Sequence, residues 1–208
     1  AHSVGAMLVV DATQSMGMVP IDAYETNADA IVSSGYKWLR GTYGAAVGFI
    51  SPSVVKTLIP GLMGFRSNSD IWDLRADRLE LPEDASRFEF TTIHFGAVLG
   101  LAAAIDELLE MGMDEVWRHD LELADHLIRG AEGLGIEVVS PTSESERSAI
   151  VSLRMPSGLS SVEVSNRLQS EYSILTTSRS GMLRVSPHID NDISQIDSLV
   201  SALSDIIS

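Results

Sequence analysis

The sequence predicts an α/β fold, and three features of the chain support that prediction. Short apolar runs bounded by Gly, Asp or Ser are typical of buried strands and occur at residues 7–10, 28–33 and 44–50. Long segments with apolar residues at helical spacing predict helices over residues 96–111, 114–134 and 190–207. Predicted strands and helices alternate along the chain, which is the pattern of an α/β protein.

The remaining elements divide the chain near residue 112. Residues 59–86 have no clean period, and we expect a long loop or short-helix excursion there. After the boundary we predict strands at residues 136–139, 149–155, 173–176 and 182–185, the last two around a turn at Ser180-Gly181. A helix is expected from Ser160 to about Glu171, with Glu163 at capping-box distance from Ser160. We therefore predict two domains, residues 1–112 and 113–208.

Composition excludes several classes of protein. The 208 residues include 14 basic and 29 acidic side chains, for a net charge of −15, and no basic stripe that would bind nucleic acid is visible. No apolar run reaches the roughly 18 residues that a membrane span needs. The absence of cysteine excludes disulfides and thiolate sites within this sequence. The chain opens without the features of a secretory signal peptide, and we predict a cytoplasmic protein.

Three polar residues point to chemistry. Asp11 ends the first predicted strand, where open α/β sheets bind ligands, and Gln14 follows three residues later. Lys37, one of only two lysines, lies between a tyrosine and a tryptophan in GYKWL. Taken singly, Asp11 reads equally as a turn cap, Gln14 as a solvated loop residue and Lys37 as a surface lysine with a packed stem.

Together these residues match the needs of pyridoxal phosphate. An amine in an apolar, aromatic setting forms a Schiff base with an aldehyde, which is the task suited to Lys37. A carboxylate such as Asp11 keeps the pyridinium nitrogen of that cofactor protonated, so that the ring accepts carbanion electrons. Ser34 and neighbouring backbone groups offer donors for the phosphate.

Longer motifs resemble one family of enzymes that use this cofactor. VVDATQSMGMVPID and DAIVSSGYKWLRGTYG resemble the core of the class V aminotransferases, a fold-type I family that includes cysteine desulfurases, kynureninase and isopenicillin N epimerase-like enzymes. RFEFTTIHFGAVLGLAAAIDELLEMG and LRVSPHIDNDISQIDSLVSAL resemble later segments of the same family. The resemblance implies the second half of such a fold: part of a large-domain, mostly parallel sheet followed by a small α/β domain.

The resemblance also implies a role for each matching residue. Asp11 pairs with the pyridine nitrogen and Gln14 with the phenolic oxygen of the cofactor. Lys37 carries the internal aldimine and moves the proton at the substrate's Cα. Ser34 binds the phosphate, and Tyr36 stands where many relatives have a phosphate-contacting histidine.

Two further positions match the family. Thr92, in FEFTTIH, corresponds to a residue that reaches the phosphate of a neighbouring subunit, which implies a homodimer. Arg184, in LRVSP, corresponds to the arginine that holds the substrate carboxylate, a task suited to its two-pronged guanidinium; the alternative is an arginine on an edge strand.

The chain departs from the family in two ways. Residues 176–182, TTSRSGM, have no counterpart of the mobile cysteine of cysteine desulfurases, so we do not expect a protein persulfide formed by that route. The family's N-terminal half, with its phosphate loop and ring-stacking residue, has no match here, so we expect either part of a longer chain or a degenerate or split form.

We therefore predict an enzyme dependent on pyridoxal phosphate that acts on an amino acid by transamination, epimerisation or C–S/Cβ lyase chemistry. The alternative is a non-catalytic, truncated α/β module for binding or dimerisation. We predict no metal site, because His94, His119, His126 and His188 lack metal-like mutual spacing and fit structural or solvated roles.

Overall fold

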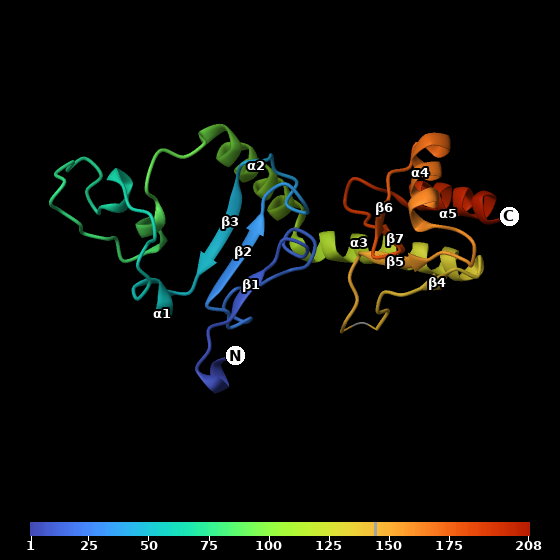
Figure 1. The fold of residues 1–208 in the computed structure, drawn as a ribbon, viewed down its shortest axis with the longest axis horizontal. Coiled ribbons are helices and arrows are strands. Elements are labelled where there is room, and N and C mark those ends of the chain that lie inside the picture. The colour runs from blue at the N-terminus through green and yellow to red at the C-terminus, as the bar shows by residue number, and fades with distance from the viewer. Residues whose placement is uncertain (144) are drawn as a thin grey trace. The chain divides into compact units, whose positions relative to one another are not determined.

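Three short strands form a mixed sheet in the first of two units, Ala1–Glu110 and Met111–Ser208, into which the chain divides. The computed structural model describes residues 1–143 and 145–208. Strands β1 (Val9–Asp11), β2 (Ala30–Ser34) and β3 (Ala46–Ile50) lie in that order (Figure 1). β1 pairs with β2 in parallel, with Asp11 opposite Val32, whereas β3 runs antiparallel to β2.

The two faces of this sheet differ. On one face Ile31 is buried with Ala12 and Ala28, and Val10 and Phe49 pack against them. Because side chains alternate along a strand, the paired register places a second set of residues on the opposite face. That set includes Asp11 and Ser34, and also Val9 and Val32, which are 62% and 45% exposed.

Between β3 and α2 the chain loops away from the sheet (teal to green in Figure 1). This stretch contains α1 (Pro52–Val55) and the single turns η2 (Phe65–Ser67) and η3 (Ala85–Phe88), in agreement with the excursion predicted for residues 59–86. Buried Arg87 ties η3 to α1, because its Nη1 donates a hydrogen bond of 2.6 Å to the carbonyl of Val55.

Helix α2 (Phe95–Met111) packs against the turn that follows β2. Its buried Leu101 fills the space where Gly35 and Gly41 have no side chain, since an added Cβ would lie 2.8 Å and 2.6 Å from the leucine methyl carbons. His94 lies just before α2 and accepts a 3.0 Å hydrogen bond at Nδ1 from the backbone N–H of Ala97. This histidine therefore has the structural role expected for it.

The second unit is a four-stranded antiparallel sheet with three helices. Its strands are β4 (Glu137–Val138), β5 (Val151–Arg154), β7 (Met182–Val185) and β6 (Thr177–Arg179), in that order across the sheet. The helices are α3 (Met113–Gly133), α4 (Ser161–Tyr172) and α5 (Ile193–Ile207). The face that carries Val151, Leu153 and Leu183 is fully buried, and Arg184 alternates onto the opposite face.

The helix ends of this unit explain one error in the predicted elements. The hydroxyl of Ser160 caps α4 by accepting from Val162 N–H, as expected for a serine at that position. At the other end Ser173 adopts a left-handed conformation, with φ 59°, and the N–H of Ile174 bonds back to the carbonyl of Leu168. Residues 173–176 thus terminate the helix, and strand β6 begins only at Thr177.

Among the described residues, no helix is both long enough and apolar enough to cross a membrane. This finding accords with the absence of a long apolar run in the sequence.

Gly17 brings the loop after β1 against the turn after β2. Its φ of +98° favours glycine, and an added Cβ would lie 2.4 Å from the backbone oxygen of Trp38. We expect Gly17→Ala to lower the free energy of unfolding by about 3 kcal/mol, because strain and a clash with backbone add together. Urea denaturation followed by fluorescence measures this change.

Gly5→Ala is the matched control, since Gly5 has φ +72° and nothing within 4 Å of an added Cβ. We expect a loss of at most about 1 kcal/mol for this variant. Equal losses for the two variants would contradict a tight approach of the two loops.

Candidate active site

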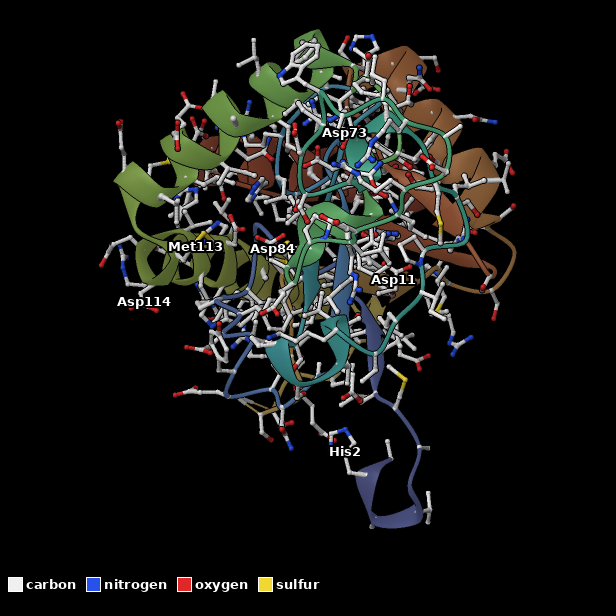
Figure 2. The ribbon with its side chains drawn as sticks, turned by 90° about the vertical axis from the view of Figure 1, so that its left-hand side faces the viewer. His2, Asp11, Asp73, Asp84, Met113 and Asp114 are labelled. Atoms are coloured by element: carbon white, nitrogen blue, oxygen red, sulfur yellow. The ribbon has the colours of Figure 1, made fainter. Side chains whose placement is uncertain are left out.

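The two parallel strands of the first unit end at the same edge of the sheet, and the predicted site residues gather there. Asp11 is the last residue of β1 (Figure 2), and Ser34 is the last residue of β2. Lys37 follows in the turn after β2, where its carbonyl accepts from Arg40 N–H and Gly35 O accepts from Gly41 N–H, both at 2.8 Å. Parallel pairing thus brings together residues more than 20 positions apart.

Thr13 links the two strand ends. Its N–H donates to Asp11 Oδ1 at 3.0 Å, and its Oγ1 accepts from the N–H of Ser34 at 3.1 Å. The two hydroxyl oxygens of Thr13 and Ser34 lie 3.4 Å apart. One residue, through its backbone N–H and its hydroxyl, therefore fixes the carboxylate of β1 relative to the serine of β2.

This arrangement lowers the pKa of Asp11. The hydroxyl of Thr13 lowers the pKa of the Asp11 carboxyl most, the N–H of Thr13 lowers it next, and the nearby ammonium of Lys37 lowers it further. Lys37 and Asp11 therefore interact as opposite charges at this edge of the sheet.

Gln14 and Trp38 join the same two loops. The indole Nε1–H of buried Trp38 donates to Gln14 Oε1 at 3.2 Å. Because an indole N–H only donates, this contact fixes which end of the glutamine amide faces the ring. Half-buried Lys37 is thus next to a packed aromatic residue, as the GYKWL motif predicts.

Tyr36 stacks on Tyr43, the rings lying 4.4 Å apart at their centroids with an interplanar angle of 23°. Both side chains are exposed, by 42% and 80%. Stacking holds the Tyr36 ring beside the strand end, where its hydroxyl serves as a donor or acceptor.

The other two predicted site residues belong to other segments of the chain. Thr92 is exposed in the segment before α2. Arg184 lies in β7 of the second unit, half-buried, and its Nε donates to Ser186 Oγ at 3.0 Å.

Thr13 is the residue that sequence reasoning missed. The available signal is its position two residues after the strand-ending Asp11, where a backbone N–H closes a turn on the aspartate carboxylate. Nothing in the local sequence, however, specifies its second contact, with Ser34.

A carboxylate held in its charged form, a neighbouring primary amine and serine and tyrosine hydroxyls form a donor set that fits a pyridoxal phosphate group. The carboxylate suits a protonated pyridine nitrogen, and the amine suits the aldehyde. The described residues contain no group of three or more His, Asp or Glu placed to hold a metal ion.

Comparison with known protein families identifies the family to which the chain belongs. A sequence model described as Aminotransferase class-V matches residues 1–199. The chain belongs to the class V aminotransferase family. Members of this family use pyridoxal phosphate.

Two probable cysteine desulfurases are similar in sequence to most of this class V chain. A probable cysteine desulfurase of Pyrococcus abyssi is 27% identical over 216 residues, which cover 98% of this chain and 53% of the relative. A probable cysteine desulfurase of Aeropyrum pernix is 33% identical over 74% of this chain and 38% of its own length. The chain thus spans about half the length of the Pyrococcus relative and less of the other.

Solved structures agree with the α/β fold predicted for this family. The apo cysteine desulfurase from Thermococcus onnurineus NA1 superimposes with a TM-score of 0.88 at 26% identity, over 100% of this chain and 54% of that one. The predicted α/β fold, which matches about half of a class V structure, is therefore confirmed.

Thr13→Val tests the link between the strand ends. Removing the hydroxyl should raise the pKa of Asp11 toward its ordinary value, because the largest cause of the lowering is lost. A lowered pKa in the folded chain stabilises the fold above the unfolded-state pKa, and this contribution disappears as pH falls through the folded-state value. In the variant the acid-side loss should be smaller, and carboxyl ¹³C NMR titration measures the shift.

Two variants complete this experiment. Thr13→Ser keeps the hydroxyl and should retain the lowered pKa. Thr26→Val removes a hydroxyl that bonds to the carbonyl of Ala23 and should leave Asp11 unchanged. An Asp11 pKa that is the same in Thr13→Val and in the parent chain would refute the assigned role of Thr13.

Proposed function

We propose that this protein is an enzyme dependent on pyridoxal phosphate that acts at Cα or Cβ of an amino acid, by transamination, epimerisation or elimination. The observation that carries the proposal is geometric: Asp11 and Ser34 end two parallel strands at one sheet edge, Thr13 bonds to both, and Lys37 follows in the next turn, in a chain of the class V family. When bound, the cofactor supplies an electron sink for charge that develops at the substrate carbon.

The residues of the first unit would contact different parts of the cofactor. Asp11 would hold a proton on the pyridine nitrogen, and its charge is maintained by Thr13. Lys37 would attach the cofactor through Nζ and, once released by substrate, hold or move the proton at Cα. Ser34 and Tyr36 would donate to the phosphate, and Gln14 would donate to the phenolic oxygen.

Arg184 would bind the substrate carboxylate, since a guanidinium offers two parallel N–H donors to two carboxylate oxygens. Thr92, which is exposed, would contact the phosphate bound by a second copy of the chain, and the working enzyme would then be a homodimer.

We infer chemistry at the substrate rather than at a protein thiol. Residues 176–182, which precede Arg184, contain no cysteine to form a persulfide on the protein. The three reaction types proposed differ in product: an oxo acid whose amino group has passed to a second oxo acid, the amino acid with inverted configuration at Cα, or, from elimination, an oxo acid with free ammonia and the released side-chain group.

Absorbance tests the attachment of the cofactor. The full-length protein with added pyridoxal phosphate should absorb at about 410–430 nm, the usual range for this group bound to lysine. Lys37→Ala should abolish the band. Lys56→Ala is the matched control, because Lys56 is the other lysine and pairs with Glu83 at the surface; it should keep the band.

A colourless protein that stays colourless with added cofactor would overturn the proposal and favour the non-catalytic module. A band that persists in Lys37→Ala would assign the attachment to another amine.

Arg184→Lys tests the carboxylate contact. Replacing the two-pronged guanidinium by a single ammonium should raise KM for the amino acid by roughly 10- to 100-fold, with a much smaller change in kcat. Arg179→Lys, at an exposed position on the neighbouring strand β6, should leave both constants unchanged. Equal effects of the two variants would remove Arg184 from the substrate site.

A further inference from the structure

The segment after β7, residues 186–191, is fastened to helix α3 by two histidines. His188 Nδ1–H donates to Asp120 Oδ2 at 2.7 Å, and His119 Nε2–H donates to the carbonyl of Asn191 at 3.0 Å. Within the segment, Asn191 Oδ1 accepts from His188 N–H at 3.1 Å, and His188 O accepts from Asn191 N–H at 2.8 Å. Residues 188–191 thus form a closed turn that contacts α3 at two points.

Asp120 is an unusual anchor, because its side chain is fully buried in α3. Its Oδ1 is buried and accepts no hydrogen bond from the described residues, so the contact with His188 is made by Oδ2 alone. Burying a carboxylate is costly unless it is paired. The pairing therefore strongly favours one position of His188, and with it one path of the segment.

That path determines where Ser186 lies. Ser186 is the first residue after β7, and its Oγ accepts from Arg184 Nε–H at 3.0 Å. This bond restricts rotation of the guanidinium about its long side chain. Asp120 and His188 are therefore connected to Arg184 through the short stretch of backbone from Ser186 to His188.

We propose that Asp120 and His188 are positioning residues that hold the Arg184 guanidinium ready to bind a carboxylate. The inference rests on the proposed function for the task of Arg184, but the connection itself concerns residues of this chain only. Breaking the Asp120–His188 pair should free the segment, weaken the bond to Ser186 and let the guanidinium rotate.

NMR of the 208-residue chain tests this connection without cofactor or substrate. The Arg184 Nε–H signal is assigned by its loss in Arg184→Lys, and its exchange with solvent is measured. In His188→Ala we expect exchange about tenfold faster, since the restraint of a hydrogen bond is lost. His188→Asn, whose Nδ2 donor occupies nearly the position of the imidazole Nδ1, should restore slow exchange.

Controls separate this effect from general loosening of the fold. His126→Ala breaks another histidine–aspartate pair on α3, that of His126 Nε2 with Asp197 at 2.6 Å, and should not change Arg184. The Nε–H of Arg154, which bonds to Glu137 at 2.8 Å, should exchange at its parent rate in His188→Ala.

Each outcome decides the inference. Faster exchange confined to Arg184, with rescue by His188→Asn, supports the positioning role. Unchanged Arg184 exchange in His188→Ala overturns it, as does equal acceleration at Arg154, which shows a merely structural role. If His188→Ala fails to fold by circular dichroism, Asp120→Ala, which removes the acceptor, is measured in its place, with the same expected acceleration and the same overturning results.

The absorbance experiment with Lys37→Ala fails or succeeds independently of this measurement. If the cofactor band is absent but Arg184 exchange depends on His188, the proposed function is refuted and the positioning role is supported. If the band is present but Arg184 exchange is unaltered in His188→Ala, the positioning role is refuted and the proposed function is supported.

Discussion

The parallel pairing of β1 with β2 is the constraint on which the candidate site depends. With Asp11 opposite Val32, the ends of both strands reach one edge of the sheet, and the turn that carries Lys37 follows directly. A shift of one residue would move Asp11 to the opposite face, because side chains alternate along a strand. The register, rather than any single side chain, therefore decides that the carboxylate and the amine meet.

Packing around the two loops secures that register. Gly17 allows the loop after β1 to approach the backbone of Trp38, and Leu101 of α2 fills the space left by Gly35 and Gly41. Thr13 bonds to both strand ends, and these contacts lower the pKa of the Asp11 carboxyl. In this unit glycines permit the loops to approach each other closely, and the hydroxyl of Thr13 acts on the charge of Asp11.

The second unit also holds a predicted site residue in position, but through different contacts. Arg184 is half-buried, on the face of the antiparallel sheet opposite the one that carries Leu153 and Leu183. The contact of half-buried His188 with buried Asp120 fixes the segment that follows the strand. The guanidinium of Arg184 is thereby restrained by residues that do not bond to it directly, and this restraint requires burial of the Asp120 carboxylate.

Local sequence determined much of this protein: the periods of the helices and strands, the cap at Ser160, and the residue types suited to one cofactor. These features depend on neighbours within a few positions, so they can be read along the chain. Folding alone decided that Thr13 joins Asp11 to Ser34, and that Asp120 meets His188 across 68 positions. Such contacts join residues distant in sequence, and their energies arise only once packing brings the partners together and removes water from between them.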